Sequence, residues 1–259
     1  MKLGTFMMPL HPPTRHAWET LREDREAIIL ADRLGYTEAY VGEHTTDLAE
    51  NVTSCLMFLS SLAFDTRQIR LGSGTLNMPN THPAAVAANV AMLDHMLQGR
   101  FIMGISPGGL MSDAEVFGSF GKDRLEMFVE AIDMVLAIWA GDAPYDLRGK
   151  HFQVSTARTM IPEIGQGIIM KPFQAPHPPI GVAGLSTFQY LPSWCHGPSS
   201  VHILRMMSSA SRVMSRFWPD MPSTLNIAQS DGSPDAECKQ QQEERRESGA
   251  RPKQDGAIG

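Results

Sequence analysis

An adjacent glutamate and histidine, Glu43 and His44, follow the short apolar segment 38–41. An imidazole at the end of a strand can take up or release a proton near neutral pH, and a neighbouring carboxylate can orient it. A histidine in such a loop can equally have a purely structural role. The position makes His44 the candidate catalytic residue and Glu43 its candidate partner.

Two loops that contain glycine could hold a flat ligand. Gly74, Thr75 and Asn77 follow the apolar segment 69–73, and Ser106 follows the next apolar segment of the chain. Glycine allows a ligand to approach the backbone closely, and the asparagine side chain offers both donors and an acceptor. An ordinary turn uses the same residue types, so the pattern alone leaves both interpretations open.

Two further features could bind an anion. Arg124 falls in the first turn of a predicted helix, where a cation is unfavourable beside the helix dipole. A bound anion would explain this arginine better than helix stability does. Gly184, Leu185 and Ser186 follow a fifth apolar segment and could form a backbone nest for a phosphate.

Several signatures of other chemistries are missing from the sequence. It has no H-E-x-x-H, G-x-S-x-G or G-x-G-x-x-G, and its three cysteines have no C-x-x-C spacing. We therefore expect no metal site, no acyl-enzyme and no disulfide framework. The net charge of −6 argues against nucleic-acid binding, and no apolar run of about 20 residues predicts a membrane span. Without a secretory signal, the chain is predicted to be cytoplasmic.

Strands and helices are predicted to alternate along the first part of the chain. This order favours parallel βα units, and the glycine-rich loop after the fourth strand, not the first, favours a barrel over a doubly wound sheet. We predict an α/β fold of the (β/α)8 TIM-barrel type, incomplete, with about four βα units and a fifth strand. The first helix should be capped by Thr14 and bury Trp18, Leu21, Ile28 and Ala31. Strands are predicted at 2–8, 38–41, 69–73, 101–105 and 179–183, helices at 14–34, 54–64, 82–97 and 123–140, and an irregular stretch at 141–178.

The sequence changes character after residue 188. Residues 1–188 carry 14 basic and 20 acidic side chains, whereas residues 189–259 carry eight of each. From Gln229 onward almost no apolar side chain occurs, and such a segment cannot bury enough surface to offset its ordering entropy. We predict two regions, a patterned region 1–188 and a poorly structured tail 189–259.

Taken together, the motifs of residues 1–188 resemble the bacterial luciferase-like flavin monooxygenases. Within that family, the opening segment and residues 161–171 are most similar to the limonene-type monooxygenases. The residues that carry the resemblance are 40–44 (YVGEH), 69–72 (IRLG), Pro79, His82, Pro83, 91–95 (AMLDH), 99–101 (GRF), Gly104, Arg124, 130–132 (EAI), Trp139 and 178–186.

The resemblance implies a barrel that binds reduced FMN, supplied by a separate flavin reductase, and activates dioxygen. It implies that His44 is the catalytic histidine and that Ser106 lies beneath the reactive edge of the flavin. Gly74 and Thr75 fall where the family bends its backbone behind the flavin ring, often through a non-proline cis peptide. Arg124 matches a phosphate contact of the family.

Further implications concern the phosphate, the substrate and the assembly. The loop Gly184–Ser186 also matches a phosphate contact, and Pro107 replaces an arginine of the luciferase branch. The substrate is expected to be small and apolar, of the terpene or aldehyde type, with Phe6, Met7 and Met8 lining its pocket. A homodimer or a heterodimer is an assembly that the resemblance allows.

The resemblance ends near residue 188, about three βα units short of the family's barrel. We therefore hypothesise that the coding sequence is frameshifted or truncated there. Two alternatives stay open: a deazaflavin-dependent dehydrogenase that shares the barrel, and a non-catalytic flavin-binding remnant.

Overall fold

A parallel sheet is the framework of the protein. The computed structural model describes residues 3–183 and 202–204, all within the first of the chain's two units, Met1–Met206. The loop 184–186, the predicted boundary at residue 188 and most of the predicted tail lie outside the described residues. The described sheet follows the order β1 (Gly4–Met7), β2 (Glu38–Val41), β3 (Arg70–Ser73), β5 (Phe101–Ser106), β8 (Ile180–Ala183) and β9 (His202–Leu204), with β4 (Leu76–Asn77) also paired to β5.

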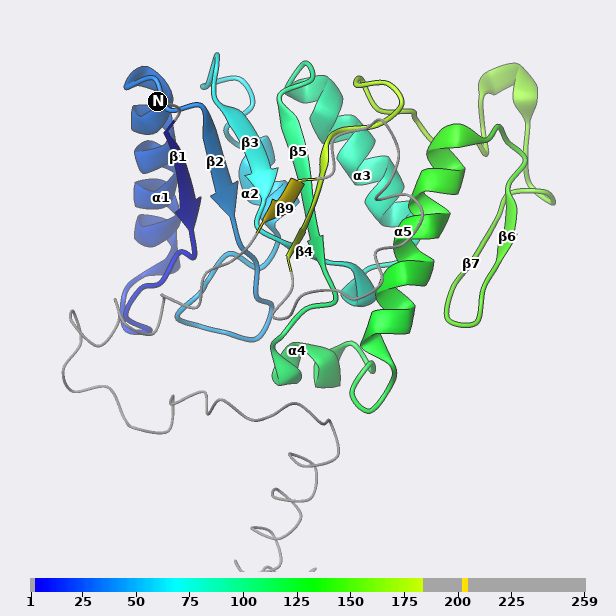
Figure 1. Ribbon diagram of the computed structural model, residues 1–259, viewed down its shortest axis with the longest axis horizontal. Helices are drawn as coiled ribbons and strands as arrows, with labels where there is room; N and C mark the ends of the chain where they lie inside the picture. The colour runs from blue at the N-terminus through cyan, green and yellow to red at the C-terminus, as the bar shows by residue number, and fades with distance from the viewer. Residues whose placement is uncertain (1–2, 184–201, 205–259) are drawn as a thin grey trace, which may run out of the picture. The chain divides into compact units, whose positions relative to one another are not determined.

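Every pairing in this sheet is parallel, and the major helices are the crossover connections between its strands. In Figure 1 the helices lie behind and beside the strands of the parallel sheet, and the arrows of β1, β2 and β3 end toward the side of the picture where α4 lies. The fold is therefore the predicted α/β type, an incomplete (β/α)8 barrel. The helices are α1 (Ala17–Arg33), α2 (Cys55–Ser60), α3 (Pro83–Met96), α4 (Met111–Val116) and α5 (Arg124–Ala140), with 3-10 turns at Met78–Asn80 and Pro162–Ile164.

The core lies between the sheet and these helices. Alternate residues of each strand face the helices, and Val41, Leu71, Met103 and Val182 are buried there. The opposite face of the sheet is less covered, and Phe6 on β1 is 41% exposed. The carboxyl ends of the strands are thus fixed by a conventional apolar core.

Side-chain caps set where most helices begin. Ser54, His82 and Asp123 precede α2, α3 and α5, and each accepts a hydrogen bond from a backbone N–H of the first turn. The α2 and α5 caps agree with the predicted starts to within a residue. The cap at His82 gives that histidine a structural role.

The first helix corrects two predictions. It is capped by His16, whose Nδ1 accepts from the backbone N–H of Trp18, and not by Thr14. Trp18 is 62% exposed and lies under the guanidinium of Arg22 instead of in the core. The buried face of the helix contains Asp24 together with Ile28 and Ala31, and Asp24 contacts His11. The helix is therefore rotated relative to the prediction, which placed only apolar side chains on the buried face.

Several short elements were not predicted. They are β4, α4 and the hairpin of β6 (Asp146–Arg148) with β7 (Gln153–Ser155), which lies in the stretch predicted to be irregular. Lys171 fastens the end of that stretch to α5, since its Nζ donates to the carbonyls of Ile138, Trp139 and Gly141. Strand β9 is a further short element, within the predicted tail. No helix among residues 3–183 and 202–204 is long and apolar enough to cross a bilayer.

Candidate active site

The candidate site residues gather at the carboxyl ends of β2, β4 and β5. The parallel register pairs Val41 with Ser73 and Asn77 with Ser106, so the loops after these strands emerge at one edge of the sheet. Figure 1 shows this edge beside α4. Carboxyl ends of barrel strands are where enzymes of this architecture place their catalytic groups.

Thr75, Asn77 and Ser106 form one hydrogen-bonded group. The hydroxyl of Ser106 donates to Asn77 Oδ1 over 3.1 Å and lies 2.7 Å from Thr75 Oγ1. The backbone N–H of Gly108 donates to the same serine oxygen over 3.1 Å. Asn77 and Ser106 are each only 8% exposed, so these contacts fix the side chains at the sheet edge. The structure thus brings three of the predicted cofactor-binding residues together.

The backbone between Gly74 and Thr75 has the bend that the resemblance implied. The peptide bond joining these residues is cis although neither is a proline. Gly74 also lies against the ring of Phe6, where an added Cβ would come within 2.8 Å of Cε2. No larger side chain fits at this position unless Phe6 moves, which explains why the residue is glycine.

Arg124 lies close to this group, at the start of α5. Its Nη2 donates to the carbonyl of Pro107 over 2.7 Å, but its buried Nε has no partner among the described residues. Burial lowers the pKa of Arg124, and the charge of Asp113 opposes that shift. Gly108 lies beside it with φ +76°, and a Cβ there would come within 2.4 Å of Nη2. A buried donor without an acceptor is rare in folded proteins.

His44 lies between two carboxylates that the sequence did not predict. Its Nδ1 is 3.3 Å from Oδ2 of Asp113, and its Nε2 is 3.3 Å from Oε2 of Glu50. Asp113 lies on α4, a helix that was not predicted from the sequence. It is 69 positions from His44, and no sequence pattern indicates that the two side chains meet. Glu50 is six positions beyond His44 in the same loop, a distance at which no local spacing rule applies.

Asp113 also holds the loop that follows His44. Its carboxylate accepts from the backbone N–H of Thr45 and from both the N–H and the hydroxyl of Thr46. Burial alone would raise the pKa of Asp113, but these hydrogen bonds, with that of His44, outweigh burial and lower it. Asp113 is therefore an ionised acceptor at neutral pH.

Glu43 does not orient His44, so that prediction is wrong. Its carboxylate accepts from the backbone N–H groups of Cys55 and Asn77 over 3.0 and 3.1 Å. Its carbonyl accepts from the side-chain amide of Asn77 over 3.2 Å. Glu43 instead ties the start of α2 to the Asn77 group.

The predicted substrate-lining residues also separate. Met7 packs into the core beneath the helices, whereas Phe6 and Met8 lie against Gly74 and Gly42 on the other face. Met7 therefore cannot line a pocket on that face. Among the described residues, no three histidine, cysteine or acidic side chains are grouped so as to hold a metal ion.

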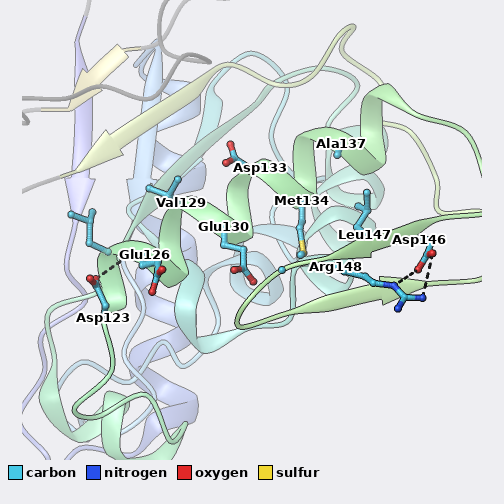
Figure 2. Close-up of a pocket in the computed structure, with 12 residues that line it drawn as sticks. Asp123, Glu126, Val129, Glu130, Asp133, Met134, Ala137, Asp146, Leu147 and Arg148 are labelled. Carbon is cyan, nitrogen blue, oxygen red and sulfur yellow. Dashed lines mark hydrogen bonds and ion pairs between the residues drawn. The ribbon is translucent and has the colours of Figure 1, made fainter.

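A cavity of about 790 Å³ lies elsewhere, between α5 and the β6–β7 hairpin (Figure 2). None of the predicted site residues lines this cavity, although Asp123 and Leu125, on either side of Arg124 in the sequence, do. Its carboxylates have partners: Glu126 contacts Lys150 and His151, and Asp146 pairs with Arg148. Glu130 accepts from three backbone N–H groups of the hairpin loop. We interpret this cavity as the place where the β6–β7 hairpin packs against α5.

Sequence relatives of known activity cover the described region. The chain is 32% identical over 161 residues to 4-hydroxyprotoasukamycin monooxygenase of Streptomyces nodosus subsp. asukaensis, which is 62% of this chain and 43% of that protein. It is 36% identical over 139 residues to limonene 1,2-monooxygenase of Rhodococcus erythropolis, 54% of this chain and 36% of that protein. It is 31% identical over 156 residues to the oxygenase component of a flavin-dependent trigonelline monooxygenase of Acinetobacter baylyi, 60% and 40%. The chain spans less than half the length of these relatives.

Solved structures share the fold. The oxygenating constituent of 3,6-diketocamphane monooxygenase from Pseudomonas putida, in complex with FMN, superposes with a TM-score of 0.66 at 24% identity, covering 71% of this chain and 51% of that one. An F420-dependent secondary alcohol dehydrogenase superposes with a TM-score of 0.54 at 21% identity, covering 71% and 53%.

Residues 1–190 match the family described as luciferase-like monooxygenase. This match agrees with the motifs around His44, the bend at Gly74 and the barrel-type sheet. The chain belongs to this family of enzymes.

Proposed function

We propose that this chain carries the flavin site of a monooxygenase that uses reduced FMN and dioxygen to oxygenate a small apolar substrate. The observation that carries the proposal is the buried Nε of Arg124, which has no partner among the described residues and lies close to the Thr75–Asn77–Ser106 group. A glycine-bounded backbone suits a planar ring, and an unpaired guanidinium donor suits a phosphate. FMN contains both groups.

The residues present fit this cofactor. Arg124 would hold the phosphate together with Gly184, Leu185 and Ser186, which lie outside the described residues. Gly74, Thr75, Asn77 and Ser106 would hold the ring. When bound, reduced FMN supplies the electrons that activate dioxygen, while the protein binds, orients and excludes water.

His44 is the proposed catalytic residue, and the chain's own contacts define what it can do. Asp113 fixes the ring through Nδ1, which leaves Nε2 as the nitrogen where a proton can be exchanged. General acid–base help of this kind contributes about 10²- to 10⁴-fold to a rate. Phe6 and Met8, on the face of the sheet that carries Gly74, are the proposed start of the apolar substrate pocket.

A separate flavin reductase is the proposed partner. One relative is named as an oxygenase component, and such a component takes reduced flavin from another protein. The substrate class is proposed from the apolar side chains Phe6 and Met8 and from the relative named for limonene. A terpene or an aldehyde would satisfy both.

A deazaflavin-dependent dehydrogenase is the second candidate, because an F420-dependent enzyme shares the fold. Oxygen isotope labelling separates the two. The full chain is mixed with reduced FMN, ¹⁸O₂ and an apolar monoterpene, and we expect ¹⁸O in the product. Hydride transfer from reduced deazaflavin to a carbonyl, with no ¹⁸O incorporated, would favour the dehydrogenase. Neither reaction, with flavin still bound, would favour the non-catalytic flavin-binding remnant.

A further inference from the structure

The two carboxylates at His44 are held in different ways. Asp113 is 2% exposed and its oxygens already accept from Thr45 and Thr46. These donors keep Asp113 ionised, so it can only accept from the imidazole. The hydrogen on the histidine ring is therefore placed on Nδ1, 3.3 Å from Asp113 Oδ2.

The contact between His44 Nε2 and Glu50 then requires a second proton, in addition to the one on Nδ1. Oε2 of Glu50 lies 3.3 Å from Nε2, at side-chain exposures of 17% for Glu50 and 20% for His44. An unprotonated Nε2 facing an ionised Glu50 would place two acceptors against each other where water screens little, which is unfavourable. One proton between the two atoms removes this conflict, either as imidazolium against carboxylate or as imidazole against carboxylic acid.

The loop is constructed so that Glu50 reaches this position. Asp47 Oδ1 accepts from the backbone N–H groups of Ala49 and Glu50 over 2.8 and 3.3 Å, which forms a tight turn. The N–H of His44 donates to the carbonyl of Val52 over 3.1 Å and closes the loop. Glu50 and His44 are thus fixed relative to each other by backbone contacts and not by their own ion pair alone.

The surroundings favour retention of a proton by Glu50. Burial raises the pKa of Glu50, the charge of His44 opposes this, and Asp47 adds to it. The titratable groups that belong to the elements around this loop are His44, Asp47, His11 with its partner Asp24, and Asp113.

We propose that Glu50 is the proton partner of His44, so that the pair holds one proton, on Nε2 or on Oε2, across the 3.3 Å contact. Glu50 is a positioning and proton-storing residue that acts through His44, and its catalytic relevance rests on the proposed function. When Nε2 gives this one proton to a reacting group, the pair is left without it, and a replacement is taken up from water at the exposed edge of Glu50. One proton leaves the pair and one returns.

The test observes the ring nitrogens directly. The full chain is labelled with ¹⁵N-histidine, and the His44 signals are assigned by their loss in His44→Gln. At neutral pH we expect Nδ1 protonated and Nε2 in the range of a protonated or proton-sharing nitrogen. In Glu50→Gln, we expect Nε2 to move toward the value of an unprotonated ring nitrogen while Nδ1 stays protonated.

Asp47→Asn is the matched control. It makes the same carboxylate-to-amide change three residues away and keeps an oxygen that can accept in the turn, so the His44 signals should not move. Nε2 signals that are unchanged in Glu50→Gln, or that shift equally in both variants, would overturn the proposal.

A second measurement covers the case in which Glu50→Gln does not fold. The carboxyl carbon of Glu50 is titrated by ¹³C NMR in the wild type and in His44→Gln. We expect the pKa of Glu50 to rise in His44→Gln, because the opposing charge is lost, and an unchanged titration would contradict a shared proton. Neither measurement uses oxygenation. A failure of the proposed function would therefore leave this result unchanged, and a failure of this proposal would leave the proposed function untouched.

Discussion

At the scale of single residues, the site has a part that handles protons and a part that holds a ligand. His44, Asp113 and Glu50 form the first part, and Thr75, Asn77, Ser106 and Arg124 form the second. Among the described residues, no hydrogen bond or ion pair joins His44 directly to the ligand-holding group. Substitutions should therefore affect proton transfer and flavin affinity separately.

His44→Ala is expected to reduce oxygenation by about 10²- to 10⁴-fold while FMN affinity stays within about twofold. The imidazole supplies proton transfer, whereas the proposed ring and phosphate contacts come from other residues. The measurement is product formation alongside a flavin titration. His95→Ala, at an exposed position near the end of α3, is the control and should change neither. Full activity in His44→Ala would remove this residue from the mechanism.

Gly108→Ala is expected to weaken FMN binding about tenfold, or about 1.4 kcal/mol. The residue has φ +76°, and the new Cβ would displace Arg124 Nη2. Gly109→Ala is a control at the next position, where a Cβ meets nothing within 4 Å, and its affinity should match the wild type. If both variants bind FMN alike, Arg124 does not need its observed position.

The sequence could predict those site residues that follow a strand directly. The position of His44, Gly74, Thr75, Asn77 and Ser106 at one edge of the sheet could be predicted because the carboxyl ends of parallel strands meet there. Asp113 and Glu50 could not be found in this way. One approaches from a six-residue helix without an apolar period, and the other depends on how a loop folds back.

At the scale of elements, buried polar contacts fix how the helices meet the strands. Asp32, near the end of α1, accepts from the backbone N–H groups of Arg67, Gln68 and Ile69 just before β3. Burial alone would raise the pKa of Asp32, but the three hydrogen bonds outweigh burial and lower it. Asp32 therefore connects two consecutive βα units.

Asp32→Ala is expected to destabilise the protein by roughly 3 kcal/mol near pH 7, because three backbone donors lose their acceptor. The folded-state pKa is lowered, so the contribution is complete above the ordinary carboxyl pKa and disappears as the pH falls through the folded value. Urea unfolding near pH 7 and at about pH 3 measures the difference, which should shrink in acid. The control is Asp142→Ala, whose side chain is fully exposed. An equal loss in both variants would contradict the account.

The main strands and helices were predictable because their apolar periods are long and their caps are recognisable. The hairpin was not, since Asp146–Arg148 and Gln153–Ser155 are short and largely polar. The rotation of α1 was also missed, because its buried face contains Thr20 and Asp24, whose contacts lie far along the chain.

At the scale of the whole molecule, the described sheet has an open side. Strand β1 has β2 as its only neighbour among the described strands. The carbonyls of Leu3 and Met7 accept from the backbone N–H groups of Thr37 and Gly42, which flank β2. The alternating pattern of a parallel strand therefore turns the N–H of Phe6 away from β2. The family and the parallel sheet could be predicted from the motifs. Whether another strand pairs with the free edge of β1 could not be predicted from them.

Amide hydrogen exchange should reveal this open edge. We expect the amide of Phe6 to exchange orders of magnitude faster than that of Tyr40, which lies on β2, between β1 and β3. Protection of Phe6 equal to that of Tyr40 would mean that another strand, from this chain or from a second one, covers β1.

The central claim is that a flavin phosphate is bound beside Arg124. The most direct test is a titration of the full chain with reduced FMN and with reduced riboflavin, which lacks the phosphate. We predict that FMN binds the wild type about 10- to 100-fold more tightly than riboflavin, as a charge-assisted hydrogen bond would provide. Arg124→Gln should remove this preference, and Arg148→Gln, on the exposed hairpin, should retain it. Equal affinities of the wild type for FMN and riboflavin, or binding of neither, would contradict the account.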